Sequence, residues 1–208
     1  MHLYGHSASG NVYKTELILA LTNQAFAQTQ IKWGTPEIAA PEFLALNPAG
    51  RVPVLKDGDF VLPESNAQLW YLAQGTPFWP ESVQDQAQVL RWLFWEQYSH
   101  EPFIAVIRYL RHYGAPGPET EQTIASKMPG AIDALNVMEQ ALAGSDWLVK
   151  EPSIADLALY AYTHVSHEAG LPLDPYPNIK KWTKRVESLP GFVPMTAYSA
   201  AAEPALAD

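Results

Sequence analysis

Apolar and polar positions follow two different rhythms along this chain, and the change falls near residue 75. Up to that point, short apolar runs of strand length alternate with helical patterns. A strand is predicted over 2–5, a helix over 12–22, and a second strand over 28–33 with Gln30 and Ile31 at its centre. Pro41 begins what reads as the first turn of a short helix.

The stretch 47–73 predicts a β-hairpin followed by a helix. Two apolar runs, 51–55 and 60–62, flank a tight turn at 56–59, and a helix begins at 64–66. Pro53 cannot donate to a strand ladder, so Val52 and Pro53 belong at the start of a strand or in a turn, where a cis bond costs little. The backbone before such a bond keeps free N–H and C=O groups, which suits a peptide-sized ligand.

Beyond residue 75 the pattern is helical throughout. Residues 74–80 hold one glycine and two prolines, so we predict a domain over 1–75, a linker over 76–82 and a helical domain over 83–208. Helices are expected over 85–112, kinked at Pro102, and over 119–142, bent at Pro129. A Ser153-to-Asp156 capping box should start a very apolar, central helix.

One more amphipathic helix is expected from Pro177, and the Ala-rich tail 196–208 should fray. The order β-α-β-α-β-β-α before residue 75 is that of a thioredoxin-like domain. The predicted fold class is therefore α/β plus all-α, an N-terminal thioredoxin-like domain followed by an all-helical C-terminal domain.

Composition removes several classes of function. The chain has 22 acidic and 13 basic residues, a formal charge of −9, and no basic cluster, which argues against a nucleic-acid partner. No apolar run approaches the roughly 20 residues that cross a bilayer, and the first residues lack signal-peptide features, so we expect a cytoplasmic protein without a membrane partner. With no cysteine, any thiol chemistry must use a thiol carried by the ligand.

Two motifs resemble the glutathione site of the soluble, cytosolic-type glutathione transferases of bacteria. They are Asn47-Pro48 with Gly50-Arg51-Val52-Pro53 and Leu55, and then Glu64-Ser65 with Ala67. The resemblance extends in order over nearly the whole chain and implies the same two-domain fold. It departs from the family where Arg51 replaces the usual lysine before Val-Pro, and where the loop 7–11 matches no single class.

The resemblance implies how glutathione binds. Ser65, at a helix start, would hold the γ-glutamyl carboxylate, and Glu64 the ammonium. Val52, kept accessible by Pro53, would pair its backbone with the cysteinyl part, and Arg51 would reach the glycine carboxylate. Read without the resemblance, Glu64-Ser65 is an ordinary helix cap, Val52-Pro53 an edge strand and Arg51 a solvated side chain. Lys14 is an alternative cation that is itself expected to be solvated.

The thiol needs an activator, because a free thiol with a pKa near ~8.5 is mostly protonated at neutral pH. A hydroxyl at the start of the first helix would favour the thiolate through a hydrogen bond and the helix dipole. Ser9 is the predicted catalytic residue, with Asn11 and Ser7 as alternatives and Tyr4 ranked below them. The competing reading is that residues 7–11 merely form a loop and a helix cap.

Aromatic residues on the helix beyond residue 85 are candidates for the second-substrate site. Tyr98, Phe103 and Tyr109 would form walls for an apolar electrophile, although aromatics at helical spacing more often belong to a core. His164 and His167 beside Glu168 lack a third well-placed ligand, so no metal site is expected.

The predicted function is a glutathione transferase, with a role in detoxification, that conjugates the thiolate of glutathione, its co-substrate, to a small hydrophobic electrophile. The resemblance implies a homodimer. One alternative is glutathione-dependent reduction of disulfides or peroxides, in which the same thiolate attacks sulfur or oxygen. The other is a non-catalytic interaction module that keeps the transferase fold.

Overall fold

A computed structural model describes residues 1–195 of the chain, so the predicted fraying of 196–208 lies outside the described residues. The first part is a four-stranded sheet in the order β2-β1-β3-β4. Strand β1 (His2–Tyr4) runs parallel to β2 (Ala27–Thr29) and antiparallel to β3 (Val54–Asp57), which pairs with β4 (Phe60–Pro63). This is the thioredoxin-like arrangement that the sequence predicted.

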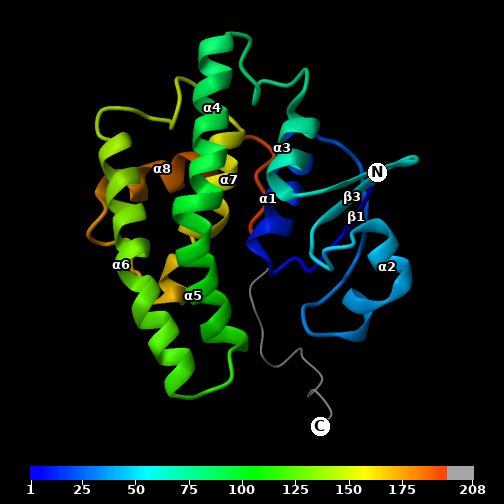
Figure 1. The fold of residues 1–208 in the computed structure, drawn as a ribbon. Helices are drawn as coiled ribbons and strands as arrows, with labels where there is room; N and C mark the ends of the chain where they lie inside the picture. Colours follow the sequence, from blue (N-terminus) through cyan, green and yellow to red (C-terminus); the bar gives the residue numbers. More distant parts are fainter. Residues whose placement is uncertain (196–208) are drawn as a thin grey trace.

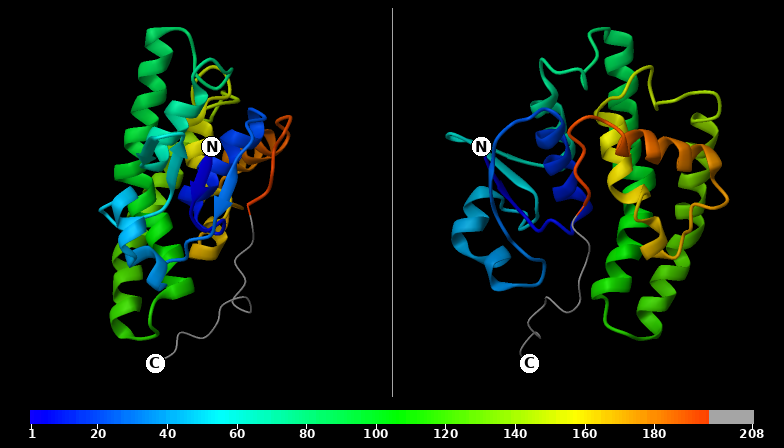
Figure 2. Two further views of the ribbon diagram at one scale, coloured as in Figure 1. Left: turned by 90° about the vertical axis from the view of Figure 1, so that its right-hand side faces the viewer. Right: turned by 180° about the vertical axis from the view of Figure 1, so that it is seen from behind.

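Helices cover both faces of this sheet (Figures 1 and 2). Helices α1 (Gly10–Leu21) and α3 (Ser65–Ala73) lie on the face toward the helical domain. The short helix α2 (Pro41–Leu46), preceded by the 3-10 turn η1 (Pro36–Ala39), lies on the other face. Both α1 and α3 pack on α7 (Ile154–Thr163), so the two parts of the molecule share a core.

The predicted second strand was placed too far along the chain. Strand β2 ends at Thr29, before the expected centre at Gln30 and Ile31, because its partner β1 offers only three residues for pairing. Ile31 is buried nonetheless, packing with Phe43 in a small separate cluster. Ile31 is apolar because it is buried in this cluster, and an apolar residue at this position was read as part of a strand.

The second part of the molecule is helical. Its elements are α4 (Val83–Trp95), the π-helical turn η2 (Glu96–His100), α5 (Glu101–Tyr113), α6 (Pro118–Ala141), α7, the 3-10 turn η3 (Ser166–Ala169) and α8 (Pro177–Glu187). The predicted helix 85–112 is interrupted by the π-helical turn rather than by Pro102. Pro102 lies in the first turn of α5, a position where a proline is tolerated. Pro129 is accommodated inside the continuous helix α6.

Helix α7 is buried along its whole length, as its apolar sequence predicted. The Ser153–Asp156 capping box begins it. Burial raises the pKa of Asp156, and four hydrogen bonds to its carboxylate oppose that shift. The donors are the Leu148 and Ser153 backbone N–H groups, the Ser153 hydroxyl and the Trp182 indole.

The exact domain limits at residues 75 and 83 stay a prediction; α3 ends at Ala73 and α4 begins at Val83. Within residues 1–195, no helix combines the length and apolar character needed to span a bilayer.

Candidate functional site

A cavity of about 320 Å³ lies between the first loop of the thioredoxin-like domain and helix α5. Of the residues predicted to bind or activate glutathione, it brings together Ser9, Asn11, Arg51 and Val52. Its other lining residues are His6, Ala8, Lys32, Trp33, Glu101, Ala105, Val106, Arg108, Tyr109, His112, Tyr113 and Tyr162. Both domains therefore contribute to one cavity.

Ser9 is the N-cap residue of α1, with extended backbone angles. Its side chain accepts no capping hydrogen bond, so its hydroxyl is not committed to the helix. Unsatisfied N–H groups and the positive end of the helix dipole meet at this point. The position suits stabilisation of an anion, which was the reason for predicting Ser9.

The three alternatives to Ser9 as the thiol activator lie in other environments. The amide of Asn11 is held at both ends, because its Nδ2 donates to Glu101 Oε1 (2.7 Å) and its Oδ1 accepts from the Ser65 hydroxyl (3.1 Å). Ser7 donates its hydroxyl to Glu16 (2.7 Å) and is absent from the cavity lining. Tyr4 lies in β1, stacked on the ring of His2. Ser9 is thus the one of these four hydroxyl or amide side chains that combines the cavity with a free capping position.

The peptide bond between Val52 and Pro53 is cis. Asn47, which is buried, donates from Nδ2 to the Arg51 carbonyl (2.8 Å) and accepts at Oδ1 from the Ala49 N–H (3.1 Å). Gln68 donates to the Pro53 carbonyl (3.2 Å). The segment is fixed from both sides while Arg51 and Val52 line the cavity. The asparagine in the sequence motif thus holds the loop.

Glu64 and Ser65 form the start of α3. Glu64 has φ 72° and ψ 108°, a backbone conformation that non-glycine residues rarely adopt and that costs roughly 1–3 kcal/mol. Glu64 is exposed, and Ser65 is buried at the first position of the helix. Neither lines the cavity directly; Ser65 reaches it through its hydrogen bond to Asn11. Such strain is tolerated where the surrounding structure enforces it, often at functional sites.

The expectation that Lys14 is solvated was wrong. Its side chain is fully buried and pairs with Glu96 at 2.9 Å and with Glu101 at 3.4 Å. Its ammonium also donates to Asn66 of α3 (3.3 Å). A basic residue on a mostly apolar helix gave no sign that two carboxylates 82 and 87 positions later would meet it.

Of the three aromatic residues predicted to hold the second substrate, one lines the cavity and two do not. Tyr109 lines the cavity, whereas Tyr98 is 84% exposed outside it and Phe103 packs against Gly130 of α6. Trp33, from the loop after β2, meets the Tyr109 ring edge-on at 5.9 Å, and Tyr113 stacks on Tyr109 at 5.3 Å. The sequence did not single out Trp33 or Tyr113.

Arg108, in the wall of the cavity, joins the two domains. Its Nε donates to Glu168 (2.6 Å) and its guanidinium also donates to the Ala8 carbonyl (2.9 Å), next to Ser9. Burial raises the pKa of Glu168, but its hydrogen bond with His112 and the charge of Arg108 outweigh burial, so the net shift is downward. Glu168 is therefore an ion-pair partner, and among residues 1–195 no group of metal-ligating side chains is found.

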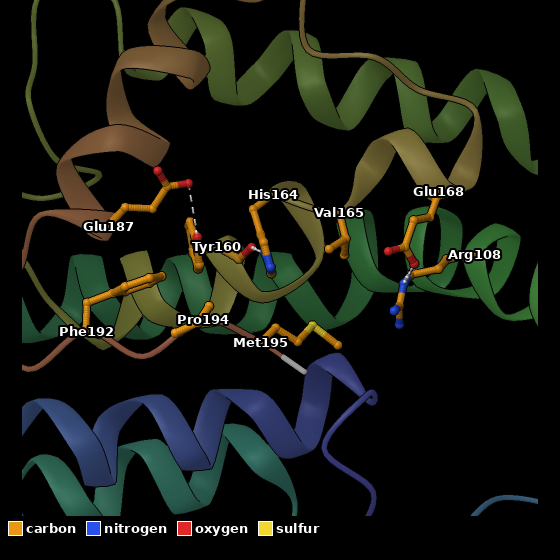
Figure 3. A pocket seen from close by; sticks show the side chains of 9 residues that line it. All are labelled: Arg108, Tyr160, His164, Val165, Glu168, Glu187, Phe192, Pro194 and Met195. Carbon is orange, nitrogen blue, oxygen red and sulfur yellow. Dashed lines mark hydrogen bonds and ion pairs between the residues drawn. The ribbon is translucent and has the colours of Figure 1, made fainter. Parts of the chain in front are cut away.

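A second cavity, of about 420 Å³, lies on the far side of Arg108. Figure 3 shows the Arg108–Glu168 pair at one end of it and Tyr160 beside Glu187 toward the other. Tyr160 donates to Glu187 (3.3 Å) and stacks on His164 at 4.3 Å. Burial lowers the pKa of His164, whose Nδ1 bonds to the Tyr160 carbonyl (2.7 Å). None of the predicted glutathione contacts lines this second cavity.

Comparison with known proteins gives two domain matches. Residues 1–74 match the glutathione S-transferase N-terminal domain, and residues 94–190 match the glutathione S-transferase C-terminal domain. Curated relatives include protein URE2 of Kluyveromyces marxianus (25% identity, 92% of this chain) and transcriptional regulator URE2 of Saccharomyces cerevisiae (26%, 92%). The chain spans 58% of the first and 66% of the second.

Solved structures agree over nearly the full length. A glutathione S-transferase from Pseudomonas fluorescens Pf-5 is 42% identical, with TM-score 0.91 and coverage of 94% of this chain and 98% of that one. One from Xanthobacter autotrophicus py2 is 43% identical, with TM-score 0.88 and coverage of 93% and 96%. Ure2p in complex with glutathione is 27% identical, with TM-score 0.82 and coverage of 91% and 90%. Both domain matches and the bacterial structures show that this chain belongs to the glutathione S-transferase family.

Proposed function

We propose that the protein is a glutathione transferase that joins the glutathione sulfur to a small apolar electrophile. The observation that carries the proposal is the cavity, in which Ser9 at the start of α1 lies with Arg51 and Val52, beside aromatic side chains of α5. Glutathione bound to a relative of 27% identity supports the same ligand here.

In this proposal the peptide lies along the cis-proline segment. The Val52 backbone pairs with the cysteinyl part, and Arg51 forms a charge-assisted bond with the glycine carboxylate. The γ-glutamyl end lies at the start of α3, where Ser65 and the helix N-terminus take its carboxylate and the exposed Glu64 takes its ammonium. The Ser65 hydroxyl then turns from Asn11 to the ligand. The electrophile is held by Tyr109 and the neighbouring rings.

Ser9 acts on the sulfur. Its hydroxyl donates a hydrogen bond to the thiolate, and the α1 dipole adds to this stabilisation, so the thiol loses its proton to solvent more readily. The thiolate attacks the electrophilic carbon, a sulfur–carbon bond forms, and the leaving group departs or an adjacent ring opens. The same thiolate attacking a disulfide or peroxide gives the reductase alternative.

A binding role without catalysis is the second candidate, and the observation that favours it is the similarity to transcriptional regulator URE2. The two candidates share the glutathione site and differ in turnover. A screen of haloaromatics, epoxides, mixed disulfides and hydroperoxides with glutathione separates them, because a binding module turns over none of these.

The decisive variant is Ser9→Ala. Loss of a hydrogen bond to a charged group predicts a kcat lowered by about 10- to 100-fold, with glutathione affinity largely kept. Ser7→Ala is the matched control, since that hydroxyl bonds to Glu16 outside the cavity. Unchanged turnover in Ser9→Ala, or the same loss in Ser7→Ala, would contradict the assignment of Ser9.

We also propose a homodimer. Support comes from an exposed apolar strip on one side of α4 and the π-helical turn, formed by Val83, Phe94 and Tyr98. Spacings of 11 and 4 residues place these three side chains on one helical face. The cytoplasmic location stays a prediction.

A further inference from the structure

Tyr162 reaches the glutathione cavity from the opposite domain. It lies on α7, the central helix of the helical part, yet its ring touches the first turn of α1. A Cβ on Gly10 would lie 2.5 Å from carbons of this ring, so only glycine permits the approach. Gly10 stands between Ser9 and Asn11. The ring is thus fixed beside the predicted thiol activator.

The hydroxyl of Tyr162 is available as a hydrogen-bond donor. The backbone N–H of Asn11 acts on its oxygen and opposes the rise of its pKa. The residue is only 7% exposed, and what remains open faces the cavity that it lines with Ser9. A hydroxyl donor on a nearly buried residue that opens into this cavity favours a ligand atom that accepts.

Charged groups surround this phenol on several sides. Burial raises the pKa of Tyr162, and Glu101 and Glu96 raise it further, whereas Arg108 and the Asn11 N–H oppose the shift. Lys14 lies 6.0 Å from the ring centre. Because the net shift is upward, the phenol keeps its proton at any pH at which the protein works, and it acts as a donor and not as a base.

We propose that Tyr162 donates a hydrogen bond to the sulfur of bound glutathione, so that the thiolate is held by two hydroxyls, one from each domain. The proposal rests on the proposed function, since it requires glutathione in this cavity. No proton leaves the phenol; the thiol proton goes to solvent, and Tyr162 joins Ser9 in stabilising the charge that remains. Tyr162 is then a catalytic residue supplied by the helical domain.

The test is Tyr162→Phe, which removes the hydroxyl and keeps the ring on Gly10. The thiol pKa of bound glutathione is measured by titrating thiolate ultraviolet absorbance in the complex without a second substrate. A hydrogen bond to a charged acceptor predicts a rise of about one pKa unit. Binding of S-methylglutathione, which has no thiolate, should match the parent. The Ser9→Ala, Tyr162→Phe double variant should shift the thiol pKa further than either single variant.

Tyr160→Phe is the matched control on the same helix, because its hydroxyl bonds to Glu187 in the second cavity (Figure 3). It should leave the thiol pKa unchanged. An unchanged thiol pKa in Tyr162→Phe, even with a lower kcat, overturns the inference, as does lost S-methylglutathione binding. A parent protein whose bound thiol titrates like free glutathione, or which binds none, instead refutes the proposed function.

Discussion

His100 is a fully buried imidazole, and one of its ring nitrogens has no hydrogen-bond partner among residues 1–195. Its Nε2 lies 2.9 Å from the Thr163 hydroxyl oxygen, and that hydroxyl points to the sulfur of Met138, so Nε2 carries the hydrogen. Nδ1 is unpaired. Adding a proton there would place an unsatisfied charged donor in the core. Burial first, and then the charge of Lys14, lower the pKa of His100 to about 3.

This residue makes stability depend on pH. Between about 6.5, the unfolded pKa, and about 3, the unfolded chain binds a proton that the folded protein does not, so stability falls as pH falls. The slope is at most about 1.4 kcal/mol per pH unit. We expect His100→Gln, which keeps a donor for Thr163, to show a shallower decline in urea unfolding between pH 7.5 and 5.5.

His164, whose pKa is also lowered, stays in both proteins, so the difference between parent and variant isolates His100. Equal slopes in the two proteins would show that His100 already carries a proton in the fold.

At the scale of elements, several hydrogen bonds converge on one side chain at the start of α7. One carboxylate, Asp156, ties together the helix cap, the preceding loop at Leu148 and the indole of Trp182 on α8. Asp156→Ala leaves several buried donors unsatisfied, at about 1–3 kcal/mol each, so we expect a loss of at least about 3 kcal/mol in the free energy of unfolding.

Denaturant unfolding measures that loss, and Asp174→Ala is its control, because Asp174 forms an exposed ion pair with Lys180 that contributes little. If Asp156→Ala yields no soluble protein, Ser153→Ala should still unfold measurably, at a cost of about 1 kcal/mol. Equal stability of the Asp156 and Asp174 variants would be incompatible with a structural role for the cap.

Elements with a local signal were predictable, and their assembly was not. The capping box, the hairpin and the cis-proline segment depend on residues a few positions apart, and the sequence predicted all three. Three contacts join residues from different domains: the buried pair of Lys14 with Glu96, the packing of Tyr162 on Gly10, and the Trp33–Tyr109 ring contact. No local pattern predicts such long-range contacts. Ser9, Asn11, Arg51 and Val52, predicted for glutathione, therefore line the cavity, whereas of the three predicted electrophile walls only Tyr109 does.

At the scale of the whole molecule, a buried polar network crosses the boundary between the domains. Asn11 and Lys14 of α1 meet Glu101 of α5, and Lys14 also meets Glu96. Removing one member of a buried ion pair costs several kcal/mol, because the other charge is left without compensation. The network therefore fixes the relative position of the two cavity walls, and the site depends on both domains folding together.

The proposed dimer concerns the exposed apolar strip on α4 and the π-helical turn. Phe94 is 71% and Tyr98 84% exposed, a large apolar area on a chain with formal charge −9. A second copy would bury this face. We expect Phe94→Glu combined with Tyr98→Lys to convert a particle of twice the 23.0 kDa chain mass into a single chain, as measured by light scattering after size exclusion. Ile132→Glu, which changes an exposed apolar residue of α6, should leave the mass unchanged. A parent protein of single-chain mass, or a double variant that stays paired, would rule out this face as the interface.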